Sequence, residues 1–167
     1  MWAFCINVLG DELIKPEKLF DAYEPGGEDI ALSGLPFFYV SVFDHWLTED
    51  EAEVCRIFTY EQARDNAALH IYEAGERSFL SFYETLRALS GVLSNPERVS
   101  ERSAGEDMEA IFIRSLREQS LMDICFTDLN LRVVGGFDRT DLMIFGDTTH
   151  ITKVKGLARD AGLYVLR

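Results

Sequence analysis

The stretch LMDICFTDLNLRVVGGFDRTDLMIF, residues 121–145, decides the fold class of this chain. It contains three short apolar runs, and the turn signals Asp128-Leu129-Asn130 and Gly135-Gly136 separate them. Short apolar runs bounded by turn residues are typical of neighbouring antiparallel strands. The stretch therefore predicts a meander, with strands at Leu121–Phe126, Leu131–Val134 and Leu142–Phe145.

The residues on either side of this meander alternate between strand and helix patterns. Apolar or β-branched runs predict further strands at Met1–Leu9, Leu35–Phe43 and Leu163–Leu166. Apolar residues at spacings of three and four predict helices, which we place after Pro16, from Thr59 to before Gly75, from Phe79 to Leu93, from about Glu106, and after a cap at Asp147, Thr148 or Thr149. The polar segment Pro96–Asp107 is predicted to be a linking loop.

The segment between Thr48 and Phe58 admits two interpretations. Val54–Phe58 is apolar, so it could pair with the preceding strand as a hairpin with a charged tip, and we take this as the first prediction. Thr48 and Glu51 have the spacing of a capping box, which predicts a helix from Glu49 instead.

These elements together predict one α+β domain covering residues 1–167. We expect a mostly antiparallel, mixed sheet of about six or seven short strands with four or five helices packed on it. The sequence has no repeat of fixed period and no linker long enough to separate two cores.

The negative charge is concentrated in the first third of the chain. The net charge is −13, and residues 1–53 account for −10 of it, with twelve acidic and two basic residues. Such a surface repels phosphate backbones and anionic lipid, so we expect no nucleic-acid or membrane partner and favour a basic protein partner. The charge can also be explained by solubility alone.

The cysteines and the N-terminal residues bear on the compartment. Cys5, Cys55 and Cys125 are too far apart for a metal or redox motif, and their odd number predicts buried thiols in a reducing compartment. The N-terminal residues resemble a strand more than a secretory signal, and no apolar run approaches the roughly 20 residues of a membrane-spanning helix. A cytoplasmic location is therefore expected.

Familiar catalytic motifs are absent from the sequence. There is no phosphate-binding glycine loop, dinucleotide fingerprint or nucleophile elbow, and His45, His70 and His150 lack a zinc-ligand spacing, so we predict no cofactor and no metal. One polar region could still supply general acid-base chemistry if the fold brings its members together, and its candidate catalytic residues are Asp138, Asp141, Asp147 and His150. Ordinary turn and cap chemistry explains the same residues.

A second set of residues suggests binding. Trp46 lies among carboxylates, and an aromatic anchor ringed by negative charge suits a basic protein surface. The candidate binding residues are Asp44, Trp46, Glu49, Asp50, Glu51 and Glu53. Alternatively, Trp46 only covers the core and the carboxylates form a solvated loop. A third set could hold an anion if it converged, and it comprises Arg98, Arg102, Arg114, Arg117 and Arg132.

The sequence thus favours a non-catalytic interaction module, inhibitory or immunity-like, that binds a cationic partner. In size and charge alone it is similar to compact acidic bacterial proteins that neutralise a basic toxin or enzyme. The alternative is a small hydrolase or ligand-binding enzyme with an Asp/His site in the C-terminal third. An exposed strand edge would also allow the chain to form a homo-oligomer.

Overall fold

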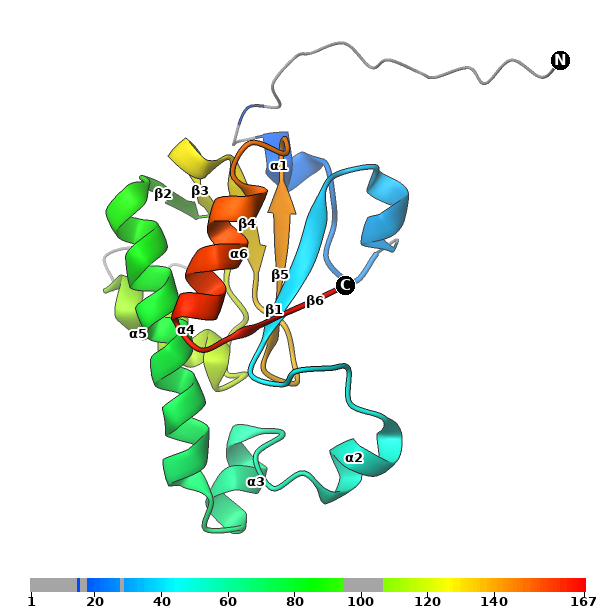
Figure 1. The fold of residues 1–167 in the computed structure, drawn as a ribbon, viewed down its shortest axis with the longest axis vertical. Coiled ribbons are helices and arrows are strands. Elements are labelled where there is room, and N and C mark those ends of the chain that lie inside the picture. The colour runs from blue at the N-terminus through cyan, green and yellow to red at the C-terminus, as the bar shows by residue number, and fades with distance from the viewer. Residues whose placement is uncertain (1–14, 16–17, 28, 95–106) are drawn as a thin grey trace, which may run out of the picture.

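The computed structural model describes residues 15, 18–27, 29–94 and 107–167. The predicted strand Met1–Leu9 and residues 96–106 of the predicted loop lie outside these ranges, as does the predicted helix start at Pro16. Within them the chain forms one six-stranded sheet with α-helices packed beside it, which confirms the predicted α+β fold (Figure 1).

All neighbouring strands of the sheet are antiparallel, and their order is β2-β3-β4-β5-β1-β6. The predicted meander forms its centre, with β3 at Asp123–Phe126, β4 at Leu131–Val134 and β5 at Thr140–Phe145. The predicted strand near residue 40 is β1 (Phe37–Ser41), and it pairs with both β5 and the terminal strand β6 (Tyr164–Leu166). Only β2 (Val92–Ser94), at the opposite edge, was not predicted as a strand.

Three helices cover one face of the sheet: α4 (Leu69–Leu89), α5 (Met108–Leu116) and α6 (Ile151–Asp160). Alternate residues of the strands point toward them because successive side chains in a strand face opposite sides. Phe38, Val133 and Phe145 belong to this face and are fully buried with Phe79 and Phe82 of α4. This layer contains most of the hydrophobic core.

The other face of the sheet is covered by the segment that precedes β1. This segment contains the short helix α1 (Lys18–Asp21), at the predicted place after Pro16, and the 3-10 turn η1 (Ile30–Ser33). A smaller apolar cluster joins it to the sheet through Ile30, Leu142 and Ile144.

A buried ion pair also holds this segment. Arg132 on β4 has no exposed surface, and its guanidinium donates to both carboxylate oxygens of Asp123 on β3, at 2.8 and 2.7 Å. Its Nη1 donates to the carbonyls of Leu19, Phe20 and Tyr23, at 2.7, 3.2 and 2.6 Å. A buried guanidinium is tolerated only when its donors are satisfied, so these carbonyls fix the α1 segment against β4.

The hairpin predicted between residues 35 and 58 is wrong. Residues Glu49–Val54 form helix α2, as the alternative interpretation stated. Thr48 Oγ1 accepts from the Glu51 N–H, and Glu51 accepts from the Thr48 N–H, so the capping box satisfies two helix N-terminal donors locally. Val54 is largely exposed, and β5 and β6 already occupy both sides of β1.

The helix boundaries between residues 59 and 93 also differ from prediction. The capping box at Thr59 begins α3 (Tyr60–Asp65), but the chain turns at Ala67, where φ is 53°, and α4 then continues through Gly75 to Leu89. Gly75 permits packing: a Cβ atom there would lie 2.2 Å from Nη2 of Arg139. Gly75 therefore lies inside α4 and does not end a helix. Its missing side chain leaves space for the Arg139 guanidinium, which comes from the β4–β5 hairpin.

The cap predicted for the last helix is likewise incorrect. His150 precedes α6 without a side-chain cap, whereas Asp147 accepts from the Thr149 N–H and from Nδ2 of Asn130, at 2.7 and 3.0 Å. Asp147 therefore fixes the turn before the helix and caps no helical donor. In the part of the chain that the structure describes, no helix is long and apolar enough to cross a membrane.

We expect Arg132→Met to lower the free energy of unfolding by about 3 to 5 kcal/mol, because the Asp123 carboxylate stays buried without its guanidinium. Urea denaturation would measure the change. Arg87→Met is the matched control, since Arg87 pairs with Glu84 on the exposed side of α4, and its loss should stay within about 1 kcal/mol. Equal losses in the two variants would contradict the role given to Arg132.

Candidate functional site

Asp141, the most buried of the four candidate catalytic residues, joins the β4–β5 hairpin to α4. Its Oδ1 accepts from the Gly136 N–H at 2.9 Å, and its Oδ2 accepts from the Tyr83 hydroxyl. Burial raises the pKa of the Asp141 carboxyl to about 6, although both hydrogen bonds act in the opposite direction. With both oxygens engaged inside the protein, Asp141 has the surroundings of a structural group.

Asp138 lies at the exposed tip of the same hairpin. It and Arg139 both adopt the left-handed conformation, with φ values of 60° and 56°. Their side chains have different surroundings. The Arg139 guanidinium is buried 4.0 Å above the ring of Tyr72 and donates to the Tyr72 carbonyl at 2.8 Å. Asp138 stays at the surface, where partial burial raises the pKa of its carboxyl.

The structure does not bring the four candidate catalytic residues together. Asp138 and Asp141 lie at the start of β5, whereas Asp147 and His150 follow its end. A six-residue strand spans about 20 Å at roughly 3.3 Å per residue, which is too far for shared proton transfer. Among the described residues, no group of three or more His, Cys, Asp and Glu side chains is arranged to hold a metal ion.

Asp138 instead meets Trp46, from the candidate binding set, at a small pocket. The pocket has a volume of about 150 Å³ and lies between the loop after β1, helix α2 and the hairpin tip. Figure 1 shows α2 below the end of the sheet where β1 and the β4–β5 hairpin turn. Aromatic rings form much of the pocket wall. They belong to Tyr39, Phe43, Trp46, Phe58 and Phe137.

Hydrogen bonds between β1 and the hairpin hold two walls of the pocket together. Oγ1 of Thr140 donates to Oγ of Ser41 at 2.8 Å, and the same Ser41 oxygen accepts from the Phe43 N–H at 3.1 Å. Ser41 is fully buried, so these bonds are shielded from water. The strand pairing thereby fixes the hairpin tip relative to the loop that carries Trp46.

Trp46 is packed on one side and open on the other. Its ring meets Tyr39 edge to face, with centroids 4.9 Å apart and planes at 78°, and its Nε1 donates to the carbonyl of Arg167 at 2.9 Å. Nevertheless 49% of Trp46 is exposed, and Phe137, which also lines the pocket, is 62% exposed. The two large apolar side chains are therefore held in place with much of their surface in water.

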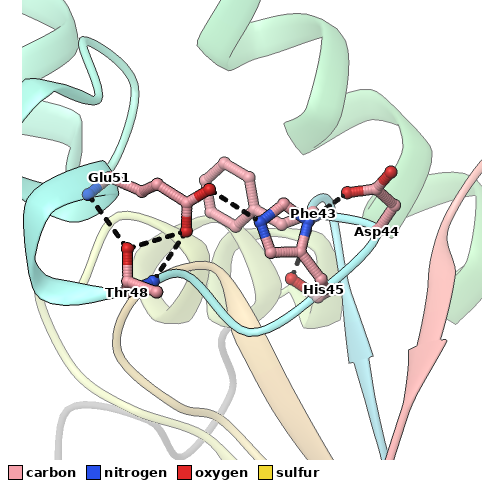
Figure 2. Close-up of polar contacts among 6 residues, drawn as sticks. Phe43, Asp44, His45, Thr48 and Glu51 are labelled. Atoms are coloured by element: carbon pink, nitrogen blue, oxygen red, sulfur yellow. Dashed lines mark hydrogen bonds and ion pairs between the residues drawn. The ribbon is translucent and has the colours of Figure 1, made fainter.

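His45 connects the Trp46 loop to α2 (Figure 2). Its Nδ1 lies 2.5 Å from Oδ1 of Asp44 and its Nε2 lies 3.2 Å from Oε1 of Glu51, whose other oxygen belongs to the Thr48 capping box. The Asp44 and Glu51 carboxylates raise the pKa of the His45 imidazole. Hydrogen bonds from Thr48 and then His45 lower the pKa of Glu51. Local contacts thus order this loop.

The acidic candidate binding residues are all exposed, on α2 or in the loop before it. They are Asp44, Glu49, Asp50, Glu51 and Glu53. Asp44 and Glu51 contact His45, and the other carboxylates of α2 are exposed on a helix whose Ala52 lines the pocket. The sequence indicated this acidic segment and Trp46, but it gave no signal that Phe58, Phe137 and Asp138 would lie beside them.

Two of the candidate arginines that the structure describes are committed to separate ion pairs. Arg132 is committed to Asp123, and Arg117 forms a two-point ion pair with Glu76 on α4, at 2.7 and 2.9 Å. Arg98 and Arg102 lie outside the described residues. Of the cysteines, Cys125 is buried as expected, Cys55 is only partly buried, and Cys5 also lies outside these residues.

The fold defines the class of the protein as an α+β domain built on an antiparallel sheet. No protein-family model, curated protein or solved structure matches the chain.

We expect Asp141→Asn to remove a pH-dependent part of the stability. The pKa of this carboxyl rises from 3.8 to about 6 on folding, so the folded state holds the proton more tightly. The stabilisation is complete below pH 4 and is lost as the pH rises through 6, which corresponds to about 3 kcal/mol at most. Urea denaturation at pH 4 and pH 7 should show a larger fall for the wild type than for Asp141→Asn. Parallel falls would contradict the assignment.

Asp44→Asn and Glu51→Gln should both lower the pKa of the His45 imidazole, with the larger effect from Asp44→Asn. The closer carboxylate contributes the stronger hydrogen bond. Nuclear magnetic resonance titration of the His45 ring would measure both shifts, with the remote Asp21→Asn as control. No shift in either variant would show that the ring is not held by these carboxylates in solution.

Proposed function

We propose that this chain is a non-catalytic interaction module that binds a cationic protein partner through α2 and the Trp46 pocket. The observation that carries the proposal is the juxtaposition of an ordered, half-exposed aromatic residue with a helix of exposed carboxylates. Buried aromatic anchors supply much of the affinity of protein interfaces, and opposite charge around them accelerates the encounter.

The surface is ordered before any partner binds. Trp46 is held by Tyr39 and the Arg167 carbonyl, and α2 is held by its capping box. A surface that is already ordered loses little conformational entropy on binding. This supports a binding role better than a purely solubilising one, because solubility requires only charge.

The proposed catalytic alternative has weaker support. It needs Asp147 and His150 near Asp138 and Asp141, and the length of β5 separates the two pairs. An inhibitory or immunity-like role remains part of the proposal as one kind of partner, namely a basic toxin or enzyme whose surface the acidic helix would cover. The cytoplasm is the location proposed for this encounter.

The test compares two variants with the same net charge. Glu49→Gln/Asp50→Asn/Glu53→Gln neutralises α2 and leaves the Thr48–Glu51 capping box intact. Asp21→Asn/Glu84→Gln/Asp160→Asn neutralises three exposed carboxylates away from α2 and the pocket. The wild type and both variants are used to capture partners from extract at low salt, and each captured protein is identified, purified and titrated directly.

We expect a basic protein that binds the wild type and the control variant alike, and that loses about tenfold or more in affinity for the α2 variant. Higher salt should weaken the binding of all three, because exposed charges are screened. If no partner is recovered, or if both variants bind it equally, the α2 surface is not the binding site.

A further inference from the structure

The pocket beside Trp46 is small for a ligand site. Its volume of about 150 Å³ is roughly half that of the smallest common small-molecule pockets, which begin near about 300 Å³. A space of this size suits one side chain of a partner. The residues that line the pocket therefore indicate which type of side chain binds in it.

The walls favour a flat cation. Trp46 and Tyr39 present rings nearly perpendicular to each other, and Phe137 also lines the pocket. Aromatic faces attract cations, and a guanidinium can also stack on them because it is planar and weakly hydrated. A lysine ammonium loses more hydration on entering such a space.

One carboxylate, Asp138, lines the pocket and can accept hydrogen bonds from a guanidinium. Burial raises the pKa of the Glu118 carboxyl and the nearby Asp138 raises it further, so a second acidic group lies close to Asp138. The neighbouring guanidinium of Arg139 is buried over Tyr72 and does not line the pocket. Partial burial raises the pKa of the Asp138 carboxyl, and a bound cation would offset that cost.

His45 also lines the pocket, and its charge must be considered. When protonated, the imidazole carries one positive charge, but it is paired with both Asp44 and Glu51. The three groups together then carry a net charge of −1. The pocket edge therefore stays attractive to a cation whether or not His45 is protonated.

We propose that this pocket receives one arginine side chain of the cationic partner, with the guanidinium against the Trp46 and Tyr39 rings and hydrogen-bonded to Asp138. This inference rests on the proposed function and specifies its central contact. The carboxylates of α2 would then provide general attraction, and the pocket would distinguish arginine from lysine.

The test uses capped peptides of glycine, serine and four lysines with one central guest residue, which is arginine, lysine or the neutral isostere citrulline. Each is titrated into the full-length protein by calorimetry at low salt. We expect the arginine guest to bind about tenfold more tightly than the lysine or citrulline guest, as expected for a stacked, charge-assisted contact. The Trp46 indole N–H resonance should shift with the arginine guest, and Trp2→Phe assigns it, since the chain has two tryptophans.

The variant Asp138→Asn should abolish the preference for arginine, so that the arginine and lysine guests bind with similar affinity. Asparagine tolerates the left-handed backbone at this position, so the hairpin tip is retained. Asp160→Asn is the matched control, and it should keep the preference. Phe137→Ala should weaken only the arginine guest.

Failure of the arginine pocket and failure of the proposed function would give different results in this test. If all three guests bind the wild type equally, the module binds cations without an arginine pocket, and this inference is overturned while the proposed function stands. If the preference survives Asp138→Asn, the assigned contact is wrong. If no peptide binds at low salt, the result counts against the proposed function itself.

Discussion

The buried pair of Arg132 and Asp123 is the interaction on which the second face of the sheet depends. Without it, the segment before β1 would be held by a small apolar cluster around Ile30 and Ile144. The pair places a buried guanidinium on that face, and carbonyls of the α1 segment accept its remaining hydrogen bonds. Because an unsatisfied buried charge costs several kcal/mol, the cation selects one position for that segment.

The opposite face depends on a different arrangement, in which two residues that follow the tip of the β4–β5 hairpin fix it to α4. Asp141 binds the Tyr83 hydroxyl in α4, and Arg139 enters the space that Gly75 leaves open in the same helix. Phe137 and Asp138 lie between these contacts and β4, and both are exposed. The exposed part of the pocket is thus positioned by buried polar contacts.

The loop that carries Trp46 is held in place by contacts with three other parts of the chain. The Trp46 loop is tied to β1 through Tyr39, to α2 through His45 and to the chain end through Arg167. The aromatic walls come from strand, loop and hairpin, so the pocket exists only when the sheet is formed. The negative charge of the surface, by contrast, comes from the exposed carboxylates of α2, which are close together in the sequence.

The sequence by itself determined the features that depend on neighbours along the chain. These are the meander of residues 121–145, the short helix near residue 20, the capping box at Thr59 and the acidic segment around Trp46, because alternation, capping and charge are local properties. At Thr48 the same capping signal competes with a predicted hairpin, and the pairing of β1 with β5 and β6 decides for the helix. Sequence reasoning failed where residues far apart in the chain decide the structure. Gly75 was predicted to end a helix, but its missing side chain instead accommodates Arg139. The four candidate catalytic residues were predicted to lie together, but the length of β5 separates them into two pairs. Only the tertiary structure could bring Asp138 to Trp46, since antiparallel pairing of β1 with β5 joins residues about 100 positions apart.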